Sequence, residues 1–240
     1  AGNHRGGCVP WVYRDRTHAG EVLANHLTHY AGQGSVTVLA LPRGGVPVAF
    51  PVARPLGAPL DILAVRKLGV PGHEELAMGA VAAGGVRVLN RDVLGGLAID
   101  DEILDEITRI ESQRLIDQEA RLRAGRRPAP IEGKTVIVVD DGLATGSTMR
   151  AAVASAKRQG AARTVVAVPV GAVSSVAAMR TVADEVVCPS TPPLFRAVGL
   201  AYLDFSEVSD SEVQRLLAEA AADASQAADP AADRPGDPDE

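Results

Sequence analysis

Two adjacent carboxylates, Asp140 and Asp141, come directly after an apolar run and directly before a loop of small residues. Glycine in such a loop lets backbone N–H groups approach a phosphate, and the N-terminus of a following helix adds partial positive charge. Carboxylates at the end of a strand suit the hydroxyl groups of a ribose. Residues 135–149 therefore predict a strand, an anion-binding loop and a helix. The hydroxyl donors of this loop are Thr145, Ser147 and Thr148.

Two further loops carry positive charge at the ends of expected strands. Residues 41–47 contain a Gly-Gly pair and Arg43 as their only charge, which suits either a plain turn or a second anion loop. Arg66 and Lys67 close the next strand, and residues 68–75 carry Gly, Pro and His with little apolar pattern. Mobile loops with basic stems often close over anionic substrates, and a solvated turn is the alternative.

The segments around these loops alternate between strand and helix patterns. Short β-branched or apolar runs indicate strands at residues 35–40, 60–65, 135–139, 163–170 and 185–187. Helical spacing of apolar residues indicates helices at residues 15–30, 46–54, 100–123, 149–159, 174–182 and 209–220. Residues 76–81 and 86–89 flank a Gly-Gly pair, which indicates a hairpin. This alternation is typical of an α/β fold with a parallel central sheet covered by helices on both faces.

Composition and charge limit the classes of function. The 240 residues are 46% apolar and 22% charged, an ordinary balance for a soluble domain. The formal charge of −6 argues against a general nucleic-acid surface. We expect the arginines at 121–127 to form a solvated helix end rather than a phosphate contact.

The ends of the chain and its two cysteines add further expectations. Residues 1–11 have no apolar core like a signal peptide, and we expect a poorly ordered leader there. Residues 223–240 are rich in Ala, Asp, Pro and Gly, which predicts a disordered tail. No apolar run approaches the ~20 residues of a membrane span. Cys8 and Cys188 are far apart in the sequence, which favours a reduced, cytoplasmic protein.

A long motif in this chain resembles that of a known family. Residues 138–148, VVDDGLATGST, are similar to the phosphoribosyl-pyrophosphate (PRPP) motif of type I phosphoribosyltransferases. The resemblance implies that Asp140 and Asp141 hold the ribose hydroxyls. It also implies that the loop cradles the 5′-phosphate through Ala144, Thr145, Gly146, Ser147 and Thr148.

The resemblance extends to the two cationic loops. Residues 41–45 look like the family's pyrophosphate loop, so Arg43 and Gly44 would face pyrophosphate. The segment VRKLGVP is similar to the start of the flexible catalytic loop in adenine phosphoribosyltransferases, which puts Arg66 and Lys67 at a closing lid. The implied fold is the type I phosphoribosyltransferase fold over residues 12–222. It would have a lid loop and hairpin at about 66–90, and a small hood from the N-terminal segment, the C-terminal segment or both.

The family's chemistry sets the expected partners. A nitrogen atom of a nucleobase-like acceptor attacks the anomeric carbon of PRPP, and pyrophosphate leaves. Mg²⁺ is the implied cofactor, bound mostly by PRPP and only indirectly by Asp140 and Asp141. Members of the family are often dimers, so a homodimer is compatible with the resemblance, with no nucleic-acid or membrane partner. Nucleotide metabolism such as purine salvage would be the setting.

The identity of the acceptor stays open. Ala144 stands where 6-oxopurine enzymes carry an acid that serves as general base, which weakens that mechanism and matches the adenine enzymes. Phe195 and Asp204 resemble an aromatic residue that stacks on the base and a nearby acid, and simple core packing of Phe195 is the alternative. A PRPP-binding regulatory protein of the same fold, with little or no catalysis, is the alternative function.

Overall fold

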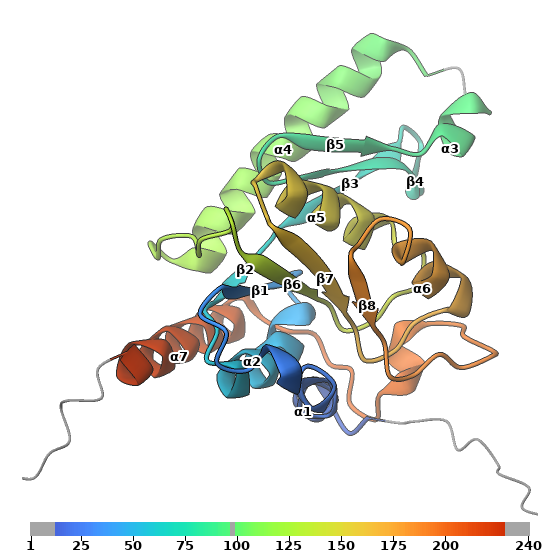
Figure 1. Ribbon diagram of the computed structural model, residues 1–240. Coiled ribbons are helices and arrows are strands. Elements are labelled where there is room, and N and C mark those ends of the chain that lie inside the picture. The colour runs from blue at the N-terminus through green and yellow to red at the C-terminus, as the bar shows by residue number, and fades with distance from the viewer. Residues whose placement is uncertain (1–12, 97–98, 229–240) are drawn as a thin grey trace, which may run out of the picture.

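A five-stranded parallel sheet forms the centre of the molecule, and its strand order is β2-β1-β6-β7-β8. The computed structural model describes residues 13–96 and 99–228 of the chain (Figure 1). β1 lies next to β6 with Leu39 opposite Val138, so the two strands end at the same edge. The expected parallel α/β architecture is thereby confirmed. The strands are β1 (Val36–Ala40), β2 (Leu60–Ile62), β6 (Thr135–Val139), β7 (Arg163–Ala167) and β8 (Glu185–Val187).

Alternate residues of the central strands face two separate cores. Val38 and Ile137 pack against helices on one face, and Leu39 and Val138 pack against helices on the other. Because side chains alternate along a strand, continuous apolar runs are what a sheet covered on both faces requires. The first face carries α1 (Arg16–Asn25), α2 (Gly45–Leu56) and α7 (Asp210–Ala228), and the second carries α5 (Ser147–Arg158) and α6 (Val173–Met179).

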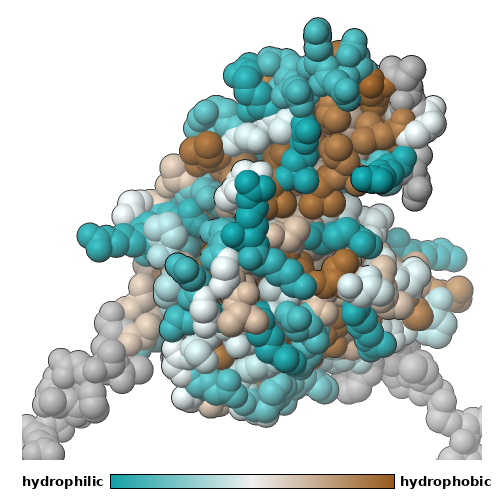
Figure 2. Space-filling view, turned by 45° about the horizontal axis from the view of Figure 1, so that its top comes forward, coloured by the Kyte–Doolittle hydropathy of each residue, from teal (hydrophilic) through white to brown (hydrophobic). Residues whose placement is uncertain are grey.

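A second, antiparallel sheet forms an arm above the parallel sheet (Figure 1). One face of this sheet packs on α4 through residues such as Leu68 and Met78, and the other packs on α5 through Ala80 and Ala82. Apolar surface gathers over the upper part of the molecule, where the arm lies (Figure 2). The arm consists of β3 (Val65–Val70), β4 (His73–Ala82), β5 (Val86–Leu89), α3 (Arg91–Gly95) and α4 (Asp101–Arg123).

Residues 68–75 differ from the expectation of a mobile loop. β3 and β4 pair as far as Val70 opposite His73, so only a tight turn at Pro71 and Gly72 joins them. Gly72 has a φ of +76°, a conformation that suits glycine. The loop prediction was wrong because Leu68 and Val70 are buried against the arm, a tertiary contact that the local sequence does not reveal. The hairpin between β4 and β5 is confirmed.

The N-terminal and C-terminal parts of the described chain meet beside the parallel sheet. Tyr13 and Tyr202 form an isolated bridge, and the Tyr13 hydroxyl donates to the Pro169 carbonyl at 2.9 Å. The short 3₁₀ segment η2 (Val198–Ala201) directly precedes Tyr202, and a second such segment, η1 (Thr28–Tyr30), follows α1. Within residues 13–96 and 99–228, none of the helices combines the length and apolar character needed to cross a bilayer.

The described residues include the first part of the predicted C-terminal tail and none of the predicted leader. Helix α7 continues to Ala228, so the prediction of disorder from residue 223 was wrong for residues 223–228. Asp223 in this last part bonds to Arg54 of α2 at 2.9 Å, a contact that composition does not indicate. The remainder of the predicted tail, 229–240, and the predicted leader, 1–11, lie outside the described residues. Cys8 does too, and Cys188 is a free thiol.

Candidate functional site

The ends of β1 and β6 bring two of the predicted loops together. The Leu41 backbone N–H donates to the Val139 carbonyl at 2.9 Å, which holds residues 41–45 beside the acids that follow β6. A Cβ atom on Gly44 would come within 2.2 Å of Asp141 Oδ2. A side chain at this position would therefore push the Asp141 carboxylate aside, and the peptide bond between Pro42 and Arg43 is cis. Adjacent parallel strands thus bring the predicted pyrophosphate loop and the predicted ribose acids into direct contact.

Asp140 and Asp141, the acid pair, occupy different environments. Burial raises the pKa of Asp140 well above its usual value, and the neighbouring charge of Asp141 raises it further. Burial also raises the pKa of Asp141, while the guanidinium of Arg16 opposes that rise. The Asp141 backbone N–H donates to Asp140 Oδ1 at 2.9 Å, so the first carboxylate is held by its neighbour's backbone. Such a pair favours a ligand that donates hydrogen bonds, because each donor lowers the cost of burying the two charges.

Three further residues lie around the acid pair. Arg16 Nε donates to Asp141 Oδ2 at 2.9 Å, and the Arg16 guanidinium lies 3.9 Å from the centre of the Phe205 ring. The Tyr202 hydroxyl donates to the Asp141 carbonyl at 2.5 Å. Tyr202 and Phe205 lie within two residues of Asp204, whereas Arg16 has no signal in the sequence beyond its place at the start of a helix. An edge built from a cation and aromatic rings is suited to a planar ring.

Residues 144–148, the phosphate loop, end at the N-terminus of α5. Gly146 has a φ of +76° and precedes Ser147, the first residue of that helix. Thr145 Oγ1 and Ser147 Oγ lie 3.3 Å apart, and the Ser175 hydroxyl of α6 donates to the Ala144 carbonyl. The hydroxyls and the first N–H groups of α5 therefore lie together, which is the arrangement of an anion site at a helix N-terminus. Thr148 is half-buried in the first turn of α5.

Arg43 is held by the C-terminal part of the chain. Its guanidinium pairs with Glu207 and lies 3.6 Å from Asp210 Oδ1. Its side chain is 39% exposed, so both pairs lie near the surface. An anionic ligand at Gly44 would compete with these two carboxylates for Arg43.

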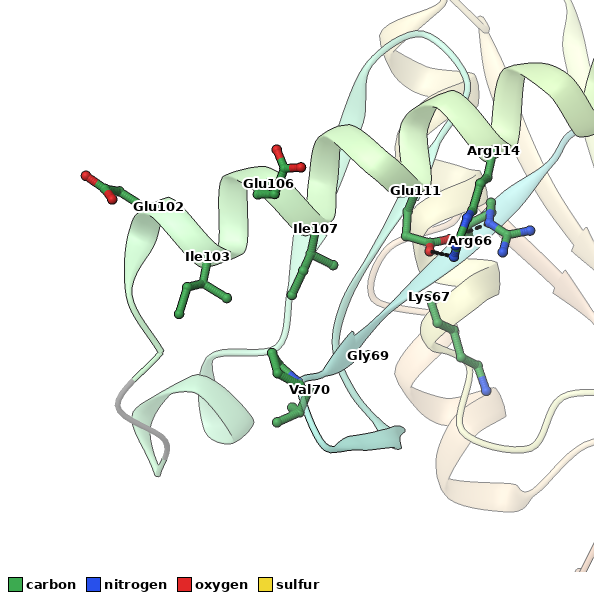
Figure 3. Close-up of a pocket in the computed structure, with 11 residues that line it drawn as sticks. Arg66, Lys67, Gly69, Val70, Glu102, Ile103, Glu106, Ile107, Glu111 and Arg114 are labelled. Carbon is green, nitrogen blue, oxygen red and sulfur yellow. Dashed lines mark hydrogen bonds and ion pairs between the residues drawn. The ribbon is translucent and has the colours of Figure 1, made fainter.

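Arg66 and Lys67 point to opposite faces of β3. Arg66 is directed toward α4, where its Nε donates to Glu111 Oε2, whereas Lys67 is directed away from that helix (Figure 3). Successive residues of a strand alternate in this way. Lys67 lines a cavity of about 640 Å³ together with Thr145 and Ser147 of the phosphate loop, and Arg66 does not. Both line the second cavity in Figure 3, of about 670 Å³, between the β3–β4 hairpin and α4.

The two candidate base-contacting residues, Phe195 and Asp204, occupy different environments. Phe195 is half-buried and packs into the aromatic cluster around Tyr13 and Tyr202. Asp204 is exposed and accepts from the Ser206 backbone N–H at 2.9 Å, and this bond lowers its pKa. Among the predicted and observed aromatic residues, it is Phe205 that stacks on the Arg16 guanidinium beside the acid pair.

The donor atoms suit a magnesium ion that brings most of its own ligands. The acid pair supplies hard oxygen atoms, which Mg²⁺ prefers. Within residues 13–96 and 99–228, however, no group of three or more His, Cys, Asp and Glu side chains could hold a metal ion. These residues therefore fit an ion bound mainly through diphosphate and water oxygens, and they do not form an all-protein metal cage.

Comparison with known proteins decides the family. A family model, the phosphoribosyl transferase domain, matches residues 16–204, well over half of the chain. This chain belongs to the phosphoribosyl transferase domain family. Proteins from two strains of Mycobacterium tuberculosis, each named "Putative phosphoribosyl transferase", are 48% identical over 226 residues. The match covers 93% of this chain and 51% of theirs, so the chain spans about half the length of these curated relatives.

A solved structure confirms the fold of this family member. The crystal structure of TT1426 from Thermus thermophilus has a TM-score of 0.75 and 44% identity, over 87% of this chain and 98% of that chain. A purine phosphoribosyltransferase from Pyrococcus horikoshii is 18% identical over 76% of this chain and 93% of its own, with a TM-score of 0.41. The similarity to the Pyrococcus horikoshii structure is too low to support an argument about the acceptor.

Proposed function

We propose that this domain uses PRPP to transfer ribose 5-phosphate to a nitrogen atom of a nucleobase-like acceptor, with release of pyrophosphate. The observation that supports this most is the meeting of the acid pair with Gly44 at the joined ends of β1 and β6. The phosphate loop follows directly in the chain at the N-terminus of α5. A ribose flanked by a phosphate and a diphosphate needs these three features side by side.

Each of these features would have a distinct task in the reaction. Asp140 and Asp141 would accept hydrogen bonds from the ribose hydroxyls, and residues 144–148 would bind the 5′-phosphate. Arg43 and Gly44 would face pyrophosphate as negative charge develops on it. Of the two predicted catalytic residues on β3, Lys67 and not Arg66 lines the cavity of the phosphate loop, so Lys67 is the better candidate for contact with the substrate. Arg66 would position β3 on α4 through its bond to Glu111.

Magnesium fits this proposal through the acid pair. Asp140 and Asp141 would hold the ion indirectly, through the ribose oxygens and water of the bound substrate. When bound, the ion would neutralise charge on the diphosphate leaving group. The chain itself would exclude water and hold the ribose in place, because water would otherwise capture the sugar.

We also propose which kind of acceptor the site favours. Ala144 supplies no acid at the position of the 6-oxopurine base, so an acceptor that needs no such group, as in the adenine enzymes, is favoured. Phe205 and Arg16, and not only Phe195 and Asp204, are candidates for contact with the acceptor ring. A cytoplasmic setting in purine salvage and a homodimeric state stay predictions from the resemblance.

The acid pair provides the first test. Asp141→Asn removes the charge that would accept from a ribose hydroxyl, and we expect PRPP affinity in the presence of Mg²⁺ to fall about tenfold or more. Isothermal titration calorimetry gives the affinity. Asp117→Asn is the matched control, because Asp117 is exposed on α4 and bonds only to Gln113 among described residues. Equal PRPP affinity in the Asp141 variant and wild type would refute the site assignment.

Pyrophosphate release separates an enzyme from a regulatory protein of the same fold. Wild-type protein with PRPP, Mg²⁺ and a panel of nucleobases should release pyrophosphate in a base-dependent manner. PRPP binding with no base-dependent release would refute the enzyme and support the regulatory alternative.

A further inference from the structure

The cavity of about 640 Å³ beside the phosphate loop, which we call the arm cleft, has a wall that the proposed reaction does not use. It is bounded by β4, β5 and α3 on one side and by the start of α5 on the other. Asp140, Asp141, Arg43 and Gly44 are not among its lining residues. The arm cleft therefore adjoins the 5′-phosphate position on a side away from the acid pair.

Three cations from three different elements line the arm cleft. They are Lys67 of β3, Arg91 of α3 and Arg150 of α5. None of the three has a carboxylate partner among the described residues, and no described side chain that lines the cleft is acidic. Uncompensated cations that converge on one cavity create a positive potential that attracts anions.

Other arginines of the arm are paired with acids. The ion pairs are Arg66–Glu111, Arg87–Asp105, Arg109–Glu106 and Arg114–Glu111. The chain has a formal charge of −6, so three cations at one cleft without a carboxylate partner among the described residues favour an anionic ligand there. The cavity in Figure 3, by contrast, includes Glu102, Glu106 and Glu111 in its lining.

The arm cleft offers more anion-binding groups than one phosphate group requires. Thr145, Ser147 and the first N–H groups of α5 already suit a single phosphate. Arg150 lies three residues further along α5, on the same face as Ser147, and extends the positive surface beyond the loop. The opposite wall includes Val88 and Leu89 and is apolar, which suits a planar ring. The volume is within the range of roughly 300–1,000 Å³ that small-molecule sites occupy.

We infer that the arm cleft is a second ligand subsite that binds a nucleoside di- or triphosphate, with its polyphosphate on Lys67, Arg91 and Arg150 and its base on the β4–β5 wall. One phosphate of this ligand lies at Thr145 and Ser147, so the nucleotide competes with the 5′-phosphate of PRPP. The inference goes beyond the proposed transfer reaction and does not require it.

Nucleotide titration with charge variants tests this subsite. Wild-type protein should bind ADP about tenfold more tightly than AMP, because the added phosphate reaches the cations of the cleft. Arg91→Gln and Arg150→Gln should each abolish most of that preference. Arg109→Gln is the matched control on the same arm and should keep it, because Arg109 pairs with Glu106 away from this cleft. Equal affinities for ADP and AMP in wild type, or an unchanged ratio in both cleft variants, would overturn the inference.

Two further measurements identify the ligand and separate this inference from the PRPP assignment. ATP should bind more tightly than inorganic tripolyphosphate, and equal binding would overturn the nucleotide assignment. Arg91→Gln should leave PRPP affinity within about twofold of wild type, since one remote charge contributes little at high dielectric. Asp141→Asn should keep the ADP-to-AMP ratio. Loss of the ratio in Arg91→Gln, with PRPP affinity unchanged in Asp141→Asn, would refute the PRPP site and leave the subsite standing.

Discussion

Asp140 and Asp141 are two carboxylates that the fold keeps adjacent although both are largely withdrawn from water. Arg16 offsets the charge of Asp141 directly. Among the described residues, the Asp141 backbone N–H and the more distant charge of Arg16 favour the charged form of Asp140. The Tyr202 hydroxyl also lies next to Asp141. Burial raises the pKa of this hydroxyl, and the negative charge of Asp141 raises it further. Burying these two carboxylates lowers the stability of the folded protein, and hydrogen bonds from a bound polyol would offset that loss.

Asp140 should therefore limit stability at neutral pH. Asp140→Asn keeps the acceptor oxygen for the Asp141 N–H but removes the buried charge, so we expect the free energy of unfolding at pH 7 to rise by about 1 kcal/mol or more. Urea denaturation at several pH values measures this change. Asp117→Asn, the exposed acid-to-amide control, should leave the free energy of unfolding unchanged within about 0.5 kcal/mol.

The direction of the pH dependence follows from the raised pKa of Asp140. A group whose pKa is higher in the folded protein binds its proton more tightly there, so wild-type stability falls as pH rises from the unfolded pKa through the folded pKa. The gain from Asp140→Asn should accordingly be absent below about pH 4, near the unfolded pKa of an aspartate, and grow toward pH 7. A gain that is largest in acid would contradict the assignment of a buried, protonation-prone carboxylate.

At the scale of elements, the end of α4 is fastened to the parallel sheet rather than solvated. Arg123 Nε donates to Asp61 Oδ1 at 3.0 Å, and its Nη2 donates to the Ile62 carbonyl at 3.0 Å. The attraction of Asp61 and Glu119 holds the pKa of Arg123 above its usual value against the opposing effect of burial. The expectation of solvated arginines was wrong at Arg123, because β2 brings a buried carboxylate to the helix end.

Arg123→Ala should break this link between the arm and the sheet. The substitution leaves Asp61 buried without its guanidinium partner, and we expect a loss of about 3 kcal/mol or more in the free energy of unfolding. Arg127→Ala is the matched control, because Arg127 is exposed and has no described partner. Chemical denaturation with circular dichroism measures both. Equal effects of the two substitutions would mean that the buried pair contributes nothing specific.

At the scale of the whole molecule, the last helix completes the core laid down by the first half of the chain. Val213, Leu216 and Leu217 of α7 are buried against the same face of the sheet as α2. Asp210, the first residue of α7, also bonds to Arg43 and Arg121. The C-terminal helix thereby covers the core, touches the end of α4 and holds the predicted pyrophosphate-loop arginine.

Truncation tests this role of α7. A chain that ends after Ser209 loses the burial of three large apolar side chains, each contributing about 1.5–3 kcal/mol, against a typical total stability of about 5–15 kcal/mol. We expect it to lose cooperative thermal unfolding in calorimetry. A chain that ends after Ala228 keeps every described residue of α7 and should unfold as wild type does. A cooperative transition at the wild-type temperature in the shorter chain would show that α7 is dispensable.

Local sequence patterns were enough to predict the parallel sheet, the positions of most helices and the anion loop after β6. These features depend on local patterns: apolar runs make strands, Gly146 permits a tight turn, and the acids stand next to the loop in the chain. The resemblance to type I phosphoribosyltransferases added the family, which the comparison with known proteins confirms. The assignment of ligand groups to individual residues stays a prediction.

Which charged side chains meet depends on how distant elements pack together. Arg16 and Asp141 are 125 positions apart and form an ion pair because α1 and the end of β6 are packed together. Arg66 and Lys67 are neighbours in sequence, yet the pleat of β3 sends one to α4 and the other to the arm cleft. The physical reason is that local patterns set backbone conformation, whereas the partner of a charged side chain depends on which distant element the core brings beside it.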